Sequence, residues 1–357
     1  MTELCGRLSE AGVSLWRAAV FVRTLHPEIM GRRFVWTQET GTAIHDAPYA
    51  TLNSADFLVS PVASVLLSGQ GFRRRLSDAA AGADMPVLAD LQAQGATDYL
   101  AAPMIFTTGD IHVATWTTRA PGGFSDVECA ALSTVVRLLA RVAEIRALRR
   151  TADNLLNAYV GRQAGSRILA GKIRRGDTEA IEAVIWYSDM RGFTALSDRV
   201  PARQVVALLN DYFDCQTPAI TKFDGEVLKY MGDGLLAVFP AAGEEAQSAC
   251  RRALGAALEA RAAVAKLPEV RFGLALHVGE VLFGNIGGGG RLDFTCIGPA
   301  VNLAARIEKV AARLGEAVVT SAAFARLCPE GLRSLGAHAL PGIAATQEVF
   351  AVAGKGA

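Results

Sequence analysis

Two aspartates in this sequence lie at positions where a carboxylate is out of place. Asp189 follows five apolar or weakly polar residues, 184–188, and Asp233 sits in a Gly-Asp-Gly turn between two mostly apolar strand segments, 226–231 and 234–239. If these strands are neighbours, the carboxylates converge and repel each other unless a cation lies between them. Oxygen ligands suit Mg²⁺, which keeps positions open for phosphate oxygens. The pair predicts a metal-assisted site for a nucleoside triphosphate; Asp233 alone could instead cap its own turn.

The segment after Asp189 is suited to phosphate groups. Gly192, Phe193 and Thr194 stand just ahead of an expected helix, so their backbone N–H groups can bind an anion. The neighbouring Arg191 is expected to be solvated. These residues extend the predicted triphosphate site beyond the two carboxylates.

Three further polar residues lie in otherwise apolar patterns. Lys229 stands four residues before Asp233 and must reach an acceptor or water. Asn302 and Arg306 share one face of a helix that begins near Pro299, and such a pair can hold an anion. An ordinary polar helix surface is the alternative for this pair.

The second half of the chain must position these residues on alternating strands and helices. The patterns predict strands at 182–189, 270–284 and 292–297, a hairpin at 225–239, helices at 201–222, 244–266 and 299–314, and late strands at "EAVVTS" and "QEVFAVAG". Hairpins interspersed with amphipathic helices indicate an antiparallel sheet with helices on one face.

The first half ends in a predicted hairpin and a long helix. "YLAAPMIF" and "IHVATWTT" flank a Thr-Thr-Gly-Asp turn, and Ser125 with Glu128 forms a capping box. The helix that follows, about 126–160, carries apolar residues at a three-four spacing: Val135, Leu138, Val142 and Ile145. Two copies could pair along this seam, or the helix could pack on its own domain. A Gly-punctuated linker follows.

Composition narrows the function classes. The sequence has 36 Lys plus Arg and 35 Asp plus Glu, so it has no excess of positive charge that would attract nucleic acid. Nucleic-acid binding is therefore not expected as the main function. The six cysteines lack a Cys-x-x-Cys pair, which favours reduced core thiols. The N-terminus does not have the build of a signal peptide, and no stretch reaches the roughly 18 apolar residues of a transmembrane helix. We expect a soluble, cytoplasmic protein of two or three domains.

Residues 180–357 resemble the catalytic domain of the class III nucleotidyl cyclases, the adenylate/guanylate cyclase family. The resemblance rests on "SDMRGFT", "EVLKYMGDGLLAVF" and "GPAVNLAARIE", which occur in the family's order and approximate spacing. It implies that Asp189 and Asp233, assisted by the Met190 carbonyl, bind two Mg²⁺ ions per site, with Mn²⁺ as a possible substitute. It also implies that Lys229 and Thr295 read the purine base.

The same resemblance implies a reaction and an assembly. Asn302 and Arg306 would orient the ribose and stabilise charge while the ribose 3′-hydroxyl attacks the α-phosphorus of ATP. The fold would be a mostly antiparallel sheet flanked by helices, acting as a head-to-tail homodimer. One protomer would give the aspartates and its partner the residues that hold the base, the ribose and the reacting phosphate.

Two departures from the family pattern concern the substrate. Thr295 stands where many adenylyl cyclases carry Asp, but its hydroxyl can accept the same hydrogen bond from the adenine amino group. With Thr at this position the sequence resembles a subgroup of bacterial adenylyl cyclases, some of which are bicarbonate-responsive. Guanylyl cyclases typically replace the Lys with Glu, so Lys229 favours ATP over GTP. Pro341 stands near a position where some relatives use Lys to hold the triphosphate.

Residues 1–125 resemble, more weakly, the GAF group of small-molecule sensor domains, on the pattern that runs from "YLAAPMIF" to "FSDVECAALSTVVRLLA". We therefore expect an α+β protein with a GAF-like α/β regulatory domain at 1–125, a signalling helix and linker at 126–177, and a cyclase domain at 178–357. Its expected function is that of an adenylate cyclase, a phosphorus-oxygen lyase, under an unknown small-molecule or other signal. The alternatives are a guanylate cyclase and a catalytically silent nucleotide- or ligand-binding module.

Overall fold

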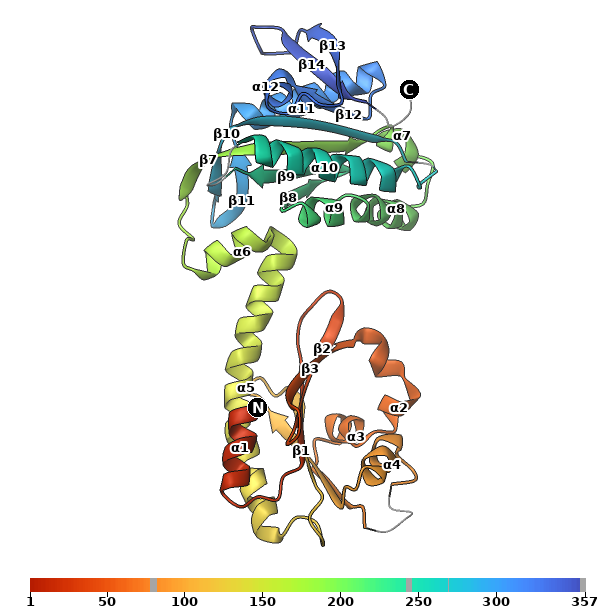
Figure 1. The fold of residues 1–357 in the computed structure, drawn as a ribbon, viewed down its shortest axis with the longest axis vertical. Coiled ribbons are helices and arrows are strands. Elements are labelled where there is room, and N and C mark those ends of the chain that lie inside the picture. The colour runs from red at the N-terminus through yellow and green to blue at the C-terminus, as the bar shows by residue number, and fades with distance from the viewer. Residues whose placement is uncertain (78–81, 242–245, 269, 354–357) are drawn as a thin grey trace. The chain divides into compact units, whose positions relative to one another are not determined.

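The structure, a computed structural model, describes residues 1–77, 82–241, 246–268 and 270–353. The chain divides into two compact units, Met1–Leu155 and Leu156–Ala357. Each unit is built on its own sheet (Figure 1). Among the described helices none is both long and apolar enough to cross a bilayer.

The N-terminal unit contains a six-stranded antiparallel sheet in the order β3-β2-β1-β6-β5-β4. Its strands are β1 (Arg17–Arg23), β2 (Ile29–Thr37), β3 (Gly41–Pro48), β4 (Phe72–Arg75), β5 (Asp98–Ile105) and β6 (Ile111–Thr118). The predicted hairpin is confirmed as β5 and β6. Its turn is closed by a hydrogen bond from Phe106 N to Asp110 O, and Gly109 adopts the left-handed backbone at φ +88°.

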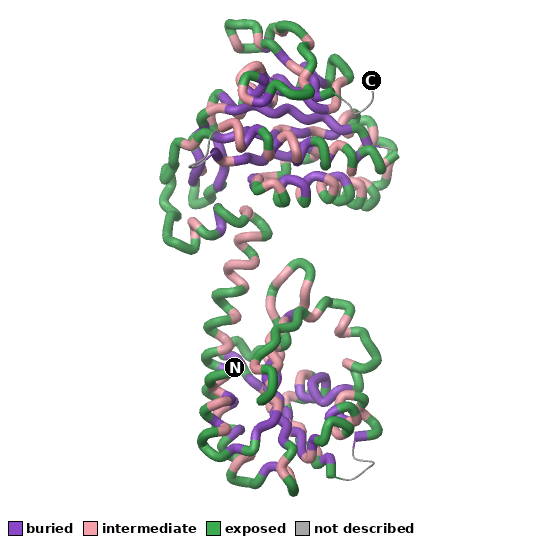
Figure 2. The backbone as a smooth tube through the Cα atoms, viewed as in Figure 1, coloured by how far each residue is buried: buried purple, intermediate pink, exposed green. Residues whose placement is uncertain are grey.

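Helices cover both faces of this sheet. They are α1 (Thr2–Glu10), the 3₁₀ helix η1 (Tyr49–Asn53), α2 (Ala55–Leu58), α3 (Pro61–Ser68), α4 (Pro86–Ala93) and α5 (Asp126–Val160). On one face, Leu8 of α1 and Leu132 of α5 pack in a core with Trp116. On the other face, Val65 of α3 and Leu88 of α4 pack in a separate core. The buried residues follow these two layers (Figure 2).

The long helix α5 begins at the predicted capping box. Ser125 N and Oγ both donate to Glu128 Oε2 at 2.8 Å, and Glu128 N donates back to Ser125 Oγ at 3.3 Å. These reciprocal bonds satisfy donors that a helix N-terminus otherwise leaves without partners. The expected start of the helix is confirmed.

The apolar seam predicted on α5 divides between two faces. Val135 packs on the core of its own unit together with Leu132 and Val136. Leu138, Val142 and Ile145 are 67%, 56% and 69% exposed. The helix therefore packs on its own domain with one face and leaves an exposed apolar stripe, defined here by Leu138, Val142 and Ile145, on another.

The C-terminal unit contains an eight-stranded sheet in the order β13-β14-β12-β10-β7-β9-β8, with β11 paired to β10. The strands are β7 (Thr178–Met190), β8 (Glu226–Met231), β9 (Gly234–Pro240), β10 (Phe272–Gly288), β11 (Arg291–Ile297), β12 (Val318–Ser321), β13 (Leu332–His338) and β14 (Gln347–Val352). Only β10 and β12 run parallel among the described pairs. The mostly antiparallel sheet agrees with the expected fold; β13 was missed by the sequence patterns.

The helices of this unit are α6 (Arg162–Leu169), α7 (Phe193–Ser197), α8 (Ala202–Asp214), α9 (Thr217–Lys222), α10 (Ala246–Val264), α11 (Pro299–Leu314) and α12 (Ala322–Leu327). The expectation of helices on one face is wrong. Trp186 of β7 packs in the core that includes α9 and α10, whereas Ile185 packs with Ala304 of α11 on the opposite face. Adjacent residues of β7 point to opposite faces, so a strand buried on both sides needs two helical layers.

Two expected helices differ in detail. The single helix predicted at 201–222 is two helices, α8 and α9, because Pro218 stands in the first turn of α9 and has no N–H to continue a helix from α8. The predicted start at residue 244 lies outside the described residues. All six cysteines are free in the structure, and four of them are buried.

Candidate active site

The two aspartates singled out from the sequence converge at one end of the sheet. Asp189 lies near the end of β7, in register with Gly273 of β10. Asp233 lies in the turn between β8 and β9, and β9 pairs with β7 through Leu235 and Ser188. Gly234, the next residue after Asp233, is so close that a Cβ placed on it would lie 3.8 Å from Asp189 Oδ1. The turn therefore brings Asp233 beside the end of β7.

The electrostatics of this acidic pair favour a bound cation. The pKa of Asp189 is raised to about 7, mainly by burial, and also by a hydrogen bond with Asp233 and by the charges of Asp233 and Glu308. Both aspartates are half-buried. Two carboxylates held together in a partly dry site repel each other unless they share a proton or bind a cation. The donor set therefore fits a hard divalent cation such as Mg²⁺, with coordination positions left for a ligand's oxygens.

Arg191 only partly offsets the charge of the pair: it lowers the pKa of Asp189, but it also has an acidic partner of its own. Its guanidinium forms an ion pair with the buried carboxylate of Glu308 on α11. It also packs over Gly273, where a Cβ would collide with the guanidinium. The expectation that Arg191 is solvated is wrong. The ion pair instead ties the segment after β7 to α11.

Lys229 belongs to a second group of residues, on β8 and β11. Its Nζ donates to Asp293 Oδ2 at 2.9 Å. Thr295 follows Asp293 by two residues on β11, so both side chains point to the same face of that strand. Thr295 is 4% exposed, and its hydroxyl has no hydrogen-bond partner among the described residues. A buried hydroxyl without a partner is unfavourable and marks a position where a ligand atom can be bound.

Asn302 and Arg306 lie on α11, as the sequence predicts. Asn302 is exposed and Arg306 is half-buried. The Arg306 guanidinium lies against the turn after β13: a Cβ at Gly342 would be 3.3 Å from Arg306 Nη2. Among the described residues neither side chain makes a hydrogen bond or an ion pair, so both are available to an anion. Pro341 belongs to the same turn as Gly342.

The segment after Asp189 forms a tight turn into a helix. Gly192 adopts the left-handed backbone at φ +73° as the N-cap of α7, which begins at Phe193. Thr194 is the second residue of this five-residue helix. Their backbone N–H groups therefore lie within a few residues of Asp189.

Two acidic residues of this site were missed in the sequence analysis. Asp293 could have been found, because it alternates with Thr295 on one strand and so shares its face. Glu308 stands two residues after Arg306 on α11, but its role depends on the packing of α11 against the end of β7. No sequence spacing reveals that contact.

Comparison with known proteins identifies this domain. Residues 177–339 match the family described as the adenylate and guanylate cyclase catalytic domain. This part of the chain belongs to that family. The three motifs "SDMRGFT", "EVLKYMGDGLLAVF" and "GPAVNLAARIE" all fall within the cyclase match, which confirms the predicted resemblance. The GAF-like resemblance of the N-terminal unit stays a prediction.

Curated relatives share the cyclase domain. The chain is 29% identical over 183 residues to "Adenylate cyclase 1" of Rhizobium meliloti (strain 1021), a match that covers 48% of the chain and 28% of the relative. It is 30% identical over 224 residues to "Adenylate cyclase" of Anabaena cylindrica, covering 57% of the chain and 43% of the relative. The matches thus span less than half the length of these relatives.

A solved structure is also similar to this chain. It is the crystal structure of the adenylyl cyclase CyaB from P. aeruginosa, with a TM-score of 0.46 and 25% sequence identity. The similarity covers 50% of this chain and 96% of the solved chain.

Proposed function

We propose that the cyclase domain converts ATP to 3′,5′-cyclic AMP and pyrophosphate, as a phosphorus-oxygen lyase. The observation that carries the proposal is the convergence of Asp189 and Asp233 inside a cyclase-family domain. Relatives whose printed name is adenylate cyclase, at 29% and 30% identity, support the choice of reaction.

The acidic pair would hold the metal ions of the reaction. Asp189 and Asp233, with the Met190 carbonyl, would bind two Mg²⁺ or Mn²⁺ ions, which supply positive charge to the triphosphate and lower the pKa of the ribose 3′-hydroxyl. Arg191 would keep the segment after Asp189 fixed through Glu308, while the N–H groups of Gly192, Phe193 and Thr194 bind phosphate oxygens.

The remaining residues would orient the nucleotide. The 3′-oxygen of the ribose forms a bond to the α-phosphorus, its proton leaves, and the bond from that phosphorus to the pyrophosphate oxygen breaks. Asn302 would hold the ribose so that the 3′-oxygen is in line with the leaving group. Arg306 would stabilise the charge that develops on the reacting phosphate. No residue needs to form a covalent intermediate.

The preference for ATP rests on Lys229 and Thr295. The exocyclic amino group of adenine can donate a hydrogen bond to the Thr295 hydroxyl, which has no partner among the described residues. The ring nitrogens of adenine can accept a hydrogen bond from the Lys229 ammonium. Guanine presents a carbonyl oxygen in place of that amino group, to which the same hydroxyl could donate, so Thr295 alone does not exclude GTP and the preference rests mainly on Lys229. We therefore assign ATP, with GTP as the alternative that the assay below decides.

The active form would be a homodimer with sites shared between two chains. Among the described residues, no hydrogen bond or ion pair joins the acidic pair to Lys229, Asn302 or Arg306. The exposed apolar stripe on α5 offers a surface along which two copies can pair, since Leu138, Val142 and Ile145 keep the spacing of a coiled-coil seam. The N-terminal unit would regulate the activity through this helix.

A four-way assay tests the function. The purified full chain is incubated with ATP or GTP, each with Mg²⁺ or Mn²⁺, and cyclic nucleotide and pyrophosphate are quantified by chromatography. Cyclic AMP with at least one metal, and none in EDTA, is the expected result. Cyclic GMP alone would make the protein a guanylate cyclase. If neither product forms under any of the four conditions, the domain is a silent signalling module.

A further inference from the structure

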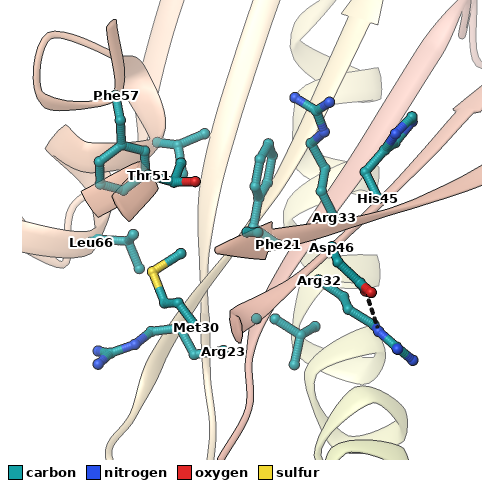
Figure 3. Close-up of a pocket in the computed structure, with 14 residues that line it drawn as sticks. Phe21, Arg23, Met30, Arg32, Arg33, His45, Asp46, Thr51, Phe57 and Leu66 are labelled. Atoms are coloured by element: carbon teal, nitrogen blue, oxygen red, sulfur yellow. Dashed lines mark hydrogen bonds and ion pairs between the residues drawn. The ribbon is translucent and has the colours of Figure 1, made fainter. Parts of the chain in front are cut away.

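The N-terminal unit has a partly open cavity of about 240 Å³ between β1–β3 and the helical segments η1, α2 and α3. Five apolar side chains form much of its lining: Phe21, Met30, Phe57, Val62 and Leu66. Figure 3 shows the Phe21 and Phe57 rings on opposite sides of this space. An apolar cavity of about 150 Å³ admits benzene. The present cavity therefore has room for a body of one or two rings.

Cations gather on one rim of the cavity because of the register of three strands. Phe21 of β1 lies opposite Arg33 of β2, and Arg33 lies opposite His45 of β3. Residues in register across an antiparallel sheet point to the same face. Figure 3 shows the Phe21 ring, the Arg33 guanidinium and the His45 ring projecting to the same side of the strands. Arg23, two residues after Phe21 on β1, shares that face and also lines the cavity.

These cations have no acidic partner of their own. Of the lining residues that the structure describes, Asp46 is the only acid, and it pairs at 2.6 Å with Arg32. In Figure 3 that ion pair lies on the other side of the strands from Arg33. Within the described part of the chain, the side chains of Arg23 and Arg33 make no hydrogen bond or ion pair. An anion at this rim would supply the partner that the Arg33 guanidinium lacks among the described residues.

We propose that the cavity binds an aromatic carboxylate of one or two rings. Its ring system would enter between Phe21 and Phe57, where aromatic pairs favour offset or edge contacts. Its carboxylate would remain at the rim and accept two parallel hydrogen bonds from the Arg33 guanidinium, whose planar fork matches the two oxygens. The His45 ring lies beside Arg33 at this end, whereas Arg23 extends beside Met30, away from it (Figure 3).

The distribution of polar groups decides the ligand class. The cationic groups lie at the rim and the walls behind them are apolar, so a ligand with one charged end and an apolar body fits. A compact inorganic anion would leave the apolar space unfilled, and a cation would face Arg23 and Arg33. The proposal stands on the N-terminal unit alone and does not depend on the catalytic function.

Isothermal titration calorimetry of the full chain tests the proposal with two matched probes, 2-naphthoate and its neutral analogue 2-naphthamide. We expect 2-naphthoate to bind with one site per chain and 2-naphthamide to bind about tenfold more weakly, a difference of about 1.4 kcal/mol, because the neutral amide loses the charge-assisted pair of hydrogen bonds. Arg33→Gln should weaken 2-naphthoate by about tenfold to the level of the amide. Arg7→Gln is the control, because Arg7 is an exposed arginine of the same unit that pairs with Glu3 and does not line the cavity, and it should change the affinity less than about twofold.

Three outcomes would overturn the proposal. They are the absence of 2-naphthoate binding up to millimolar concentration, equal affinity for the acid and the amide, and an unchanged affinity in Arg33→Gln. Far-ultraviolet circular dichroism and the melting temperature of both variants must match the parent, so that a loss of binding reports on the guanidinium and not on unfolding.

Discussion

Each of the two sheets gathers like charges at one place, but the two places differ in burial. In the C-terminal unit, Asp189 and Asp233 are half-buried and the pKa of Asp189 is raised to about 7, first by burial. In the N-terminal unit, Arg33 and His45 are exposed at the mouth of a cavity. Water screens the exposed cations and does not fully screen the acids. Removing a charge from the acidic pair should therefore change activity and stability strongly. Removing Arg33 should change stability little in the absence of a ligand.

The largest effect is expected from Asp189→Asn. It removes one of the two proposed carboxylate ligands of the metal ions, so cyclic nucleotide production should fall by about a hundredfold or more. In EDTA the same change removes like-charge repulsion, and the melting temperature should rise by about 2–4 °C for each 1 kcal/mol gained. Mg²⁺ should stabilise the parent and not the variant, as measured by differential scanning calorimetry.

Asp198→Asn is the matched control for this variant, because Asp198 is exposed at the end of α7. It should keep both the activity and the response to Mg²⁺. Activity of Asp189→Asn within a few-fold of the parent would show that the acidic pair is not the metal site.

A smaller loss is expected from Lys229→Glu, which places an acid beside Asp293 and removes the donor to the base. ATP turnover should fall by about tenfold to a hundredfold, the range of a lost charge-assisted hydrogen bond. The charge swap Lys229→Glu with Asp293→Lys separates two roles of Lys229. If Lys229 reads the base, the swap restores the ion pair but not the ATP turnover.

Rescue of turnover by the swap would mean that Lys229 only pairs with Asp293. A gain of GTP turnover is not required of Lys229→Glu, since Thr295 would also have to suit guanine and specificity needs both attractive and repulsive elements. Kinetics with ATP and GTP on the three proteins distinguish these outcomes.

Mixing two inactive proteins, Asp189→Ala and Arg306→Ala, tests whether the sites are shared. In a mixed dimer one site contains both substitutions. The other site takes Asp189 from the Arg306→Ala chain and Arg306 from the Asp189→Ala chain, so it is unmutated. With random exchange about half the dimers are mixed and each has one good site, so about a quarter of the parent activity should return.

Exchange must be demonstrated first, by mixing differently tagged chains and recovering both in one purification. If the chains exchange and the mixture remains inactive, the aspartates and Arg306 act within one chain. The catalytic charges would then come from one chain, as the basic side chains of the N-terminal cavity do.

The acidic site was largely predictable because its signals are local in the sequence. A carboxylate that ends an apolar strand and a Gly-Asp-Gly turn identify Asp189 and Asp233, and a four-residue helical spacing identifies Asn302 and Arg306. The start of α5 followed from a three-residue capping pattern. Each of these features depends on residues that lie close together in the sequence, within about one helical turn or one β-hairpin.

The features that escaped prediction depend on long-range packing. The cationic rim exists because β1, β2 and β3 align Phe21, Arg33 and His45, and no sequence spacing states that register. Arg191 looked solvated because its partner, Glu308, is 117 residues away. The second helical layer over the sheet follows from burial of β7 on both faces, which an apolar run alone does not distinguish from burial on one face.

The smallest effect compares two adjacent arginines of β2 in the absence of ligand. Arg32 pairs with Asp46 at 2.6 Å, with side chains 28% and 52% exposed, whereas Arg33 stands opposite His45 without an acid. Partly exposed ion pairs contribute about 0.2–1 kcal/mol, so Arg32→Gln should lower the free energy of unfolding by that amount. Arg33→Gln should leave it unchanged or raise it slightly, because it removes a charge facing the imidazole. Urea unfolding of the parent and of the two variants measures both effects. A larger loss from Arg33→Gln than from Arg32→Gln would mean that Arg33 stabilises the fold, and the contrast drawn between the two charge clusters would be wrong.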